Sequence, residues 1–369
     1  MRTVRLLELG TVPPARSQAC YHAAAYVQDE RTPDTVILVS PSDPYVCVGF
    51  HQEVDREVDR DYCREHGLPV LRREVGGGAV YLDRDQVFIQ WVFHPDSLPA
   101  RVDERFRLYV EPLVRAYRAL GVEAVYRPVN DVHVRGRKIC GTGAARIGRA
   151  EVVVGSLMFD FDRASMARVL KLSSEKMRDK VFQGLRDYMT TLRDELGRAP
   201  DRGEVVDLYR RELGAVLGAE LVPGEWTMAE EARARELDRT LGAEEWLGEK
   251  GAARRAGIKI HEDVHIGVSA HKAPGGLVRV TARLREGRID DISISGDFTV
   301  YPRETVAAIE AALRGSSADR QVVLTTIEDS YRTLSVQSPG VTPEDWAEAV
   351  ALAADFGTKG PVPSGQKSG

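Results

Sequence analysis

The stretch from Leu71 to Phe93 constrains the fold more than any other segment, because it contains three consecutive glycines, Gly76, Gly77 and Gly78. A glycine inside a helix or a strand loses backbone entropy that an alanine would not lose. Three glycines in a row are therefore typical of a sharp turn, where a ligand or another backbone segment comes close. We refer to residues 76–78 as the glycine turn.

The residues around the glycine turn indicate a binding site for an anion. Arg72 and Arg73 come before it, and apolar residues at alternate positions follow it. This pattern predicts a hairpin of two half-buried strands, at 80–82 and 87–93. Cations and free backbone amides on a glycine turn at the edge of a sheet form an anion site. We therefore expect a phosphate or a carboxylate to bind against a sheet.

Composition limits the classes of protein to consider. The 369 residues can bury a sizeable core and predict two domains, and the net charge of −5 disfavours bulk attraction to nucleic acid or to an anionic membrane. No apolar run is long enough to cross a bilayer, and the N-terminus lacks the apolar core of a signal peptide. The four cysteines follow no zinc or CxxC spacing, which favours reduced thiols in a cytoplasmic protein.

The order of the expected elements predicts an α+β protein. Strands and helices alternate irregularly through residues 1–250, which favours a mixed sheet flanked by helices. One of these helices is expected at 55–66, a polar segment that ends at Gly67. Three strands with period-two patterns follow, joined by glycine turns, and they predict a small α+β domain at 256–340. We expect helices near 304–315 and 342–354, and a disordered tail at 357–369, which is rich in Gly, Pro, Ser and Lys.

A second glycine-rich segment, GRKICGTGAA, contains Lys138 just before Gly141 and Gly143. It predicts two strands joined by a tight turn at Arg135–Gly136, and then a loop at 141–151 that could close over an intermediate. A lysine beside such a loop can present a mobile positive charge to a phosphate. Neither the P-loop spacing nor a GxGxxG following a strand into a helix is present, so a nucleotide site here would be of another kind.

Taken together, the two segments resemble a known family. RREVGGGAVYLD resembles the RRxxGGGxVxHD motif of the lipoate–protein ligase A family. VNDVHVRGRKICGTGAARI, followed by VVVGSLMFDFD, resembles that family's ND, RK, SGSA and HGT-LL run. The small strand-rich domain that ends in GDF resembles the family's C-terminal accessory domain. The resemblance covers roughly residues 5–336, and it implies the catalytic fold of biotin and lipoate ligases, which is similar to that of class II synthetases.

The resemblance also implies an activity. In this family, lipoate or octanoate attacks the α-phosphate of ATP, with Mg2+ as cofactor, and pyrophosphate leaves. A lysine of a lipoyl carrier protein then attacks the resulting acyl-adenylate and forms an amide. The implied carriers are an E2 lipoyl domain or the H protein of the glycine-cleavage system.

The same resemblance implies roles for individual residues. Lys138 would be the catalytic residue that bridges the phosphate and acyl oxygens, and Arg73 would hold the adenylate. Asn130 and Asp131 would lie near the adenine or the Mg2+ ion, with Asp131 as a metal ligand, and Asp83 would support the hairpin. The amides of the glycine turn would line the acyl channel. The other expected substrate- and adenylate-binding residues are Arg72, Val75, Gly76, Gly77, Gly78, Ala79, Cys140, Gly141, Thr142, Gly143 and Gly155.

Departures from the family pattern leave two alternatives open. Leu82 and Val154 stand where the motifs have histidine, and Val75 stands where many members have serine. These losses raise the alternative of a non-catalytic protein that binds lipoyl carriers. Cys140 occupies a position that is often serine, which raises an ATP-independent octanoyl or lipoyl transferase with a thioester on that cysteine. We favour the ligase.

Overall fold

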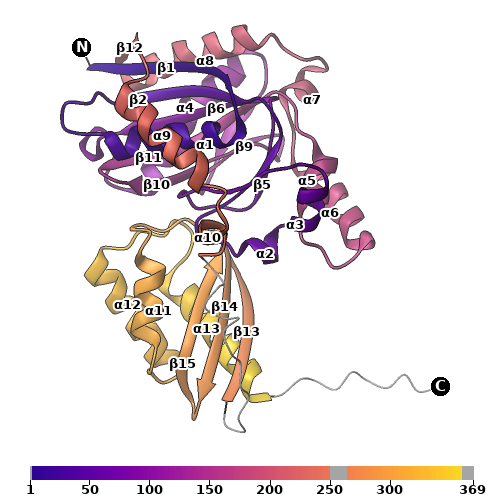
Figure 1. The fold of residues 1–369 in the computed structure, drawn as a ribbon, viewed down its shortest axis with the longest axis vertical. Coiled ribbons are helices and arrows are strands. Elements are labelled where there is room, and N and C mark those ends of the chain that lie inside the picture. Colours follow the sequence, from indigo (N-terminus) through magenta and orange to yellow (C-terminus); the bar gives the residue numbers. More distant parts are fainter. Residues whose placement is uncertain (1, 250–263, 360–369) are drawn as a thin grey trace. The chain divides into compact units, whose positions relative to one another are not determined.

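The computed structural model describes residues 2–249 and 264–359 of the chain (Figure 1). The chain divides into two compact units, Met1–Glu249 and Lys250–Gly369, and each unit has its own sheet and helices. None of the helices in the described ranges combines the length and the apolar character needed to cross a lipid bilayer.

A six-stranded mixed sheet is the framework of the first unit. Its strands are β1 (Arg2–Val12), β2 (Thr35–Pro41), β6 (Gln86–Phe93), β10 (Gly143–Ile147), β11 (Ala150–Met158) and β12 (Ala219–Pro223). They lie in the order β10-β11-β6-β2-β1-β12. Strand β1 pairs in parallel with β2 and β12, and the other pairs are antiparallel. The predicted mixed sheet is confirmed.

Helices cover both faces of this sheet, as the neighbours of β6 show. Val92 packs in the apolar cluster that includes α1 residues, whereas Trp91, on the opposite face, contacts Tyr109 of α4 and Tyr209 of α8. All eight residues of β6 are therefore buried. The longer helices of the unit are α1 (Pro14–Val27), α4 (Val102–Ala119), α6 (Glu175–Tyr188), α8 (Arg202–Leu217) and α9 (Met228–Thr240).

The predicted hairpin at 80–93 is wrong. Strand β5 (Val80–Leu82) pairs with β3 (Tyr45–Val48), which also pairs with β4 (Val70–Arg72). Strand β6 instead pairs with β2 and β11 in the large sheet. The apolar residues of β6 lie at consecutive positions, which is typical of a strand covered on both faces and not of a half-buried hairpin strand.

The predicted tight turn at Arg135–Gly136 is confirmed, but the loop expected at 141–151 is wrong. A three-stranded antiparallel sheet is formed by β7 (Ala124–Arg127), β8 (Asp131–Val134) and β9 (Arg137–Gly141). Arg135 and Gly136 both have positive φ, 49° and 81°, as two-residue hairpins require. Strand β10 fills most of the expected loop and pairs with β11 along its whole length, although its sequence, GAARI, has weak strand propensity.

The short helices of the first unit also differ from expectation. One polar helix was predicted near 55–66, but Val58 is extended and bridges to Leu170, which separates α2 from α3. The short helical segments are α2 (Val54–Glu57), α3 (Arg60–Glu65), the 3-10 turn η1 (Pro95–Ser97), α5 (Arg163–Val169), α7 (Leu192–Leu196) and α10 (Glu244–Leu247).

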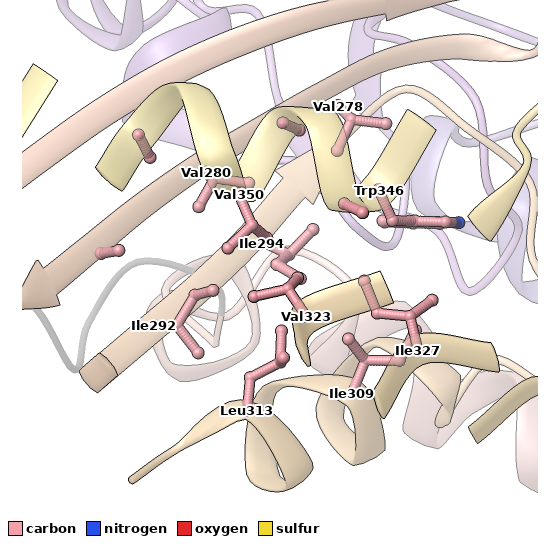
Figure 2. Close-up of a cluster of buried hydrophobic side chains, with 14 of the residues drawn as sticks. Val278, Val280, Ile292, Ile294, Ile309, Leu313, Val323, Ile327, Trp346 and Val350 are labelled. Carbon is pink, nitrogen blue, oxygen red and sulfur yellow. The ribbon is translucent and has the colours of Figure 1, made fainter. Parts of the chain in front are cut away.

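The second unit packs an antiparallel sheet of three strands against three helices. Figure 2 shows its core, where Val280 and Ile294 of the sheet lie near Val323 and Val350 of the helices. The elements are β13 (Val264–Ala273), β14 (Gly276–Arg285), β15 (Arg288–Gly296), α11 (Thr305–Leu313), α12 (Arg320–Leu334) and α13 (Pro343–Lys359).

Two features of this unit differ from the sequence-based expectation. Helix α12 was not predicted, because its many β-branched residues lower helix propensity. Capping by Asp319 and burial of Val323 and Ile327, one turn apart, favour the helix. Helix α13 extends beyond the expected domain end at 340 and includes 357–359 of the expected tail. The rest of that tail, and residues 250–263, lie outside the described residues.

Candidate active site

Arg73 organises the glycine turn from inside. Its Nη2 donates to the carbonyls of Gly76 (2.9 Å) and Gly78 (2.8 Å), and its Nη1 donates to the carbonyl of Cys47 (3.2 Å). Gly77 has φ +94°, and a Cβ placed there would lie 3.0 Å from Nη2 of Arg73. The turn therefore needs glycine at 77. The sequence analysis expects Arg73 to hold an adenylate. In the structure its guanidinium donates to the carbonyls of Gly76 and Gly78.

Arg72, the second cation before the turn, is completely buried. Its guanidinium donates to five backbone carbonyls, those of Gly49, Phe50, Gln52, Trp246 and Leu247. Burial lowers the pKa of Arg72 to about 10. We conclude that Arg72 connects the segment after β3 to α10, and we leave it out of the proposed binding site.

The glycine turn and the second glycine-rich segment come into contact. A Cβ placed on Gly143 would lie 2.6 Å from Cγ1 of Val75 and 3.5 Å from the carbonyl oxygen of Gly76. Val75 is fully buried, whereas residues 77–79, which include Ala79, are partly exposed. The partly exposed residues of this segment are thus 77–79. The start of β10, at Gly143, packs against Val75 and Gly76.

Lys138 lies on β9, which forms a hairpin with β8 that we call the Lys138 hairpin (residues 131–141). A bulge between Val132 and His133 shifts the register, so that His133 is opposite Lys138 and Asp131 is opposite Gly141. The Nζ of Lys138 lies 2.8 Å from Oδ1 of Asp131. A Cβ on Gly141 would lie 2.7 Å from Nζ, so the lysine side chain packs closely over this glycine. About a quarter of the Lys138 side chain is exposed (27%).

Salt bridges and hydrogen bonds hold the Lys138 hairpin in place. Arg135 in its turn and Arg137 directly after the turn both pair with Glu195 of α7. At the open end, Thr142 donates its backbone N–H and its hydroxyl to the carbonyl of Asn130, at 3.0 and 2.8 Å. The Asn130 side-chain amide donates back to the carbonyl of Thr142. These hydrogen bonds between Asn130 and Thr142 therefore fix the first residue of β8, Asp131.

Asp83 and Gly155, two further expected site residues, have contacts within the fold. Asp83 accepts a hydrogen bond from the backbone N–H of Asp85 (3.0 Å) in the connection between β5 and β6. Burial raises the pKa of Asp83 to about 6. A Cβ on Gly155 would lie 3.1 Å from the Tyr109 ring and 3.2 Å from Cγ2 of Thr142, so glycine there permits close packing.

Cys140 lies on the face of the hairpin opposite to Lys138. The bulge places Cys140 opposite Val132, whereas Lys138 shares its face with Asp131 and His133. The Cys140 side chain is fully buried, and burial raises the pKa of its thiol to about 11. The other three cysteines, Cys20, Cys47 and Cys63, are also free and buried, with thiol pKa values raised by burial.

His133 is a residue near Lys138 that the sequence reasoning missed. It is buried (2% exposed), and its Nε2 lies 3.7 Å from Oδ2 of Asp131. The signal was present in the sequence, because residues two apart on a strand, such as Asp131 and His133, share a face. The carboxylate thus lies between an ammonium and an imidazole.

Family models match both units. The model of the lipoyl protein ligase A/B catalytic domain matches residues 17–214. The chain belongs to this lipoyl protein ligase A/B family. The model of the bacterial lipoate protein ligase C-terminus matches residues 268–349, which lie in the second unit. The predicted family and the accessory domain type are therefore confirmed.

Relatives of this lipoyl protein ligase A/B family member have two kinds of activity. It is 28% identical to the octanoyltransferase LipM of Kyrpidia tusciae over 67% of this chain and 98% of the relative. It is 24% identical to the lipoate-protein ligase LplJ of Bacillus subtilis over 85% of this chain and 90% of the relative. The comparison shows an acyl-transferring family but does not separate ligase from transferase.

Solved structures share the catalytic fold. A bipartite lipoate protein ligase from Thermoplasma acidophilum, described together with its E2 lipoyl domain, is 29% identical with a TM-score of 0.61, over 67% of this chain and 97% of that one. A lipoate-protein ligase A bound with ATP is 26% identical with a TM-score of 0.57, over 67% and 98%. The expected lipoate ligase fold is thus confirmed.

Proposed function

We propose that this protein is an ATP-dependent lipoate–protein ligase. It activates lipoate, or octanoate, as an acyl-adenylate, and it transfers the acyl group to a lysine of a lipoyl carrier protein, either an E2 lipoyl domain or a glycine-cleavage H protein. The observation that carries this proposal is the placement of Lys138, which lies partly exposed beside Gly141, two residues before the Gly143 that packs against Val75 and Gly76. The ATP-bound relative and the relative described with its E2 lipoyl domain support the nucleotide and the carrier.

Lys138 is the residue that acts on the reacting groups. Its ammonium leaves Asp131 and places its charge between the α-phosphate and the carboxylate of the acid. At about 4 Å from a phosphate oxygen, such a charge contributes about 4 kcal/mol near a protein surface. This stabilises the charge that develops during adenylate formation. The amides of Gly77 and Gly78 orient the acid from the partly exposed side of the turn.

Asp131 is the carboxylate that suits Mg2+ in this arrangement. Among the described residues, no three His, Cys, Asp or Glu side chains gather in a way that could hold a metal ion. Mg2+ needs few protein ligands, however, because it is commonly bound by one or two carboxylates together with substrate phosphates. When bound, the ion neutralises phosphate charge. Asp131 would be the residue of this chain that holds it.

The buried cysteines disfavour the transferase alternative through Cys140. A thiolate nucleophile needs an accessible sulfur and a lowered pKa. Cys140 has neither, because its side chain is fully buried and burial raises its thiol pKa to about 11. The cytoplasmic location expected from the sequence stays a prediction; the four free cysteines agree with it.

The first test measures exchange of labelled pyrophosphate into ATP in the presence of lipoate, octanoate or biotin. The second measures transfer of the acyl group to a purified E2 lipoyl domain and to an H protein. We expect exchange with lipoate and octanoate but not with biotin, and ATP-dependent modification of a carrier lysine. Acyl transfer from an octanoyl carrier without ATP would instead identify a transferase. Carrier binding without either reaction would identify the non-catalytic alternative.

A further inference from the structure

We propose that His22 is a positioning residue that holds the glycine turn in place through Glu74. This inference rests on the proposed function, since it assigns a role in binding the acid that is adenylated. It starts from a buried side chain that the mechanism above does not use. His22 lies on α1, and its side chain is completely buried (0% exposed).

The hydrogen bonds of His22 connect α1 to the segment before the turn. Its Nε2 accepts a hydrogen bond from the backbone N–H of Glu74 (3.1 Å), and its Nδ1 lies 2.7 Å from the carbonyl oxygen of Gln18, one helical turn earlier. A neutral imidazole has one donor and one acceptor nitrogen. Because the N–H of Glu74 needs an acceptor, Nδ1 carries the proton and donates it to Gln18. Both ring nitrogens are therefore used, and the ring has a fixed orientation.

The backbone on either side of Glu74 pairs with the segment after β3. The N–H of Arg73 donates to the carbonyl of Val48 (3.1 Å). The carbonyl of Val75 accepts a hydrogen bond from the N–H of Phe50 (3.1 Å). Glu74 lies between these two residues and donates its own N–H to the imidazole on α1. The segment 73–75 is thus held by two separate parts of the fold, and the imidazole supplies one of them.

The Glu74 side chain makes a second contact with α1. The hydroxyl of Tyr26 donates to the Glu74 carboxylate and lies 2.7 Å from Oε1 and 2.9 Å from Oε2. Tyr26 comes four residues after His22, so the two side chains lie on one face of the helix. The Arg233 guanidinium stacks over the Tyr26 ring, 4.3 Å from its centroid, and restricts its movement. One helix therefore holds Glu74 both at its N–H and at its carboxylate.

Glu74 lies between the two residues that shape the glycine turn. Arg73 donates to two carbonyls of the turn, and Val75 packs against Gly143 at the start of β10. A shift of Glu74 would displace both neighbours and, with them, the turn amides that orient the acid. A binding site is precise when rigid elements hold its contact groups. His22 supplies this support by fixing the turn to a buried helix.

Two substitutions separate the hydrogen bond of His22 from its volume. Glutamine can place its amide oxygen near the position of Nε2, whereas leucine fills the space without an acceptor. We expect H22L to raise the KM for lipoate in pyrophosphate exchange about tenfold and to change kcat and the KM for ATP less than about twofold, because the turn contacts the acid in the ground state and in the transition state alike. H22Q should keep the KM for lipoate within about threefold of the wild-type value.

Tyr209 provides the control for a general loss of stability. Y209F also removes a buried hydrogen bond, the one that Trp91 donates, but on the opposite face of the sheet from α1. It should leave the KM for lipoate unchanged, and thermal unfolding compares its stability with that of H22L. A wild-type KM for lipoate in H22L would overturn the proposal. Equal rises in the KM for lipoate and for ATP would also overturn it, since they indicate a general distortion of the unit.

A readout that needs no turnover separates this inference from the proposed function. Isothermal titration measures the Kd of lipoate and of octanoate without ATP, and hydrogen–deuterium exchange measures the opening of the backbone at 71–79. H22L should weaken acid binding about tenfold and speed exchange at 71–79, and H22Q and Y209F should do neither.

The outcomes distinguish the two proposals. If the wild type binds lipoate but shows no pyrophosphate exchange, the ligase proposal fails, yet the Kd values still test His22. Faster hydrogen exchange in H22L with an unchanged Kd would leave His22 a purely structural residue and remove its role in acid binding. A wild type that binds neither acid would overturn both proposals.

Discussion

The glycine turn and the Lys138 hairpin both place cations next to glycines, but the cations have different partners. Arg72 and Arg73 donate to backbone carbonyls and are buried, so they stabilise the fold around the turn. Lys138 instead contacts one carboxylate and stays partly exposed. Carbonyls enclosed in the fold cannot be exchanged for a ligand, whereas a single carboxylate at an accessible position can. The partner of a cation therefore indicates whether it is available for chemistry.

The largest expected effect tests the available cation. Lys138→Ala should lower lipoate-dependent pyrophosphate exchange at least about a thousandfold, roughly 4 kcal/mol of transition-state stabilisation, while the fold is retained. Steady-state exchange and circular dichroism measure the two quantities. The exposed Lys171 provides the control, and Lys171→Ala should change neither. Full exchange by Lys138→Ala would remove the catalytic assignment.

The second effect tests the enclosed cation. Arg72→Met removes a buried hydrogen-bond donor from each of five carbonyls, so it should lower the free energy of unfolding by about 3 kcal/mol. Urea denaturation measures this quantity. Arg64, which is exposed and pairs only with Asp61 in the described structure, is the control, and Arg64→Met should cost less than about 0.5 kcal/mol. Equal effects would show that the carbonyl contacts of Arg72 contribute little.

A third prediction concerns the glycine turn itself. Gly77→Ala introduces a Cβ at φ +94° and 3.0 Å from Nη2 of Arg73, and it should lower the free energy of unfolding by about 2 kcal/mol and also lower exchange activity. Gly67 also has positive φ, but a Cβ added there would meet no atom within 4 Å. Gly67→Ala should therefore cost only the backbone term, about 1 kcal/mol, and preserve activity. If both variants keep full exchange activity, the glycine turn has no role in catalysis.

The smallest effect is a pH dependence at Asp83. Burial raises the pKa of this carboxyl in the folded state to about 6, above its ordinary value of 3.8. Between these values the unfolded chain releases the proton and the folded chain keeps it, so the stability of the wild type falls as pH rises. Asp83→Asn removes this loss. It should be the more stable protein above pH 6 and show a diminishing advantage below it, as thermal unfolding across pH would measure. An advantage that does not depend on pH would contradict the burial explanation.

Local sequence predicted those features that depend on residues close together in the chain. The turn at Arg135–Gly136 follows from the positive φ that glycine favours. Pairing between distant segments was predicted less well. The residues at 143–147 have weak strand propensity, and β10 pairs with β11 along its whole length.

The sequence by itself determined the family, the mixed α+β architecture, and the presence of a lysine beside a glycine-rich segment, because motif spacing and residue periodicity are properties of the linear chain. Only the tertiary structure decided which of the cations stays partly exposed and that the Cys140 thiol is buried. Arg72 donates to carbonyls from segments far away in the chain, such as that of Leu247. A one-residue bulge places Cys140 on the buried face of its hairpin and Lys138 on the face of Asp131 and His133. Burial and register arise from long-range packing, and they determine the charge and the accessibility of each group.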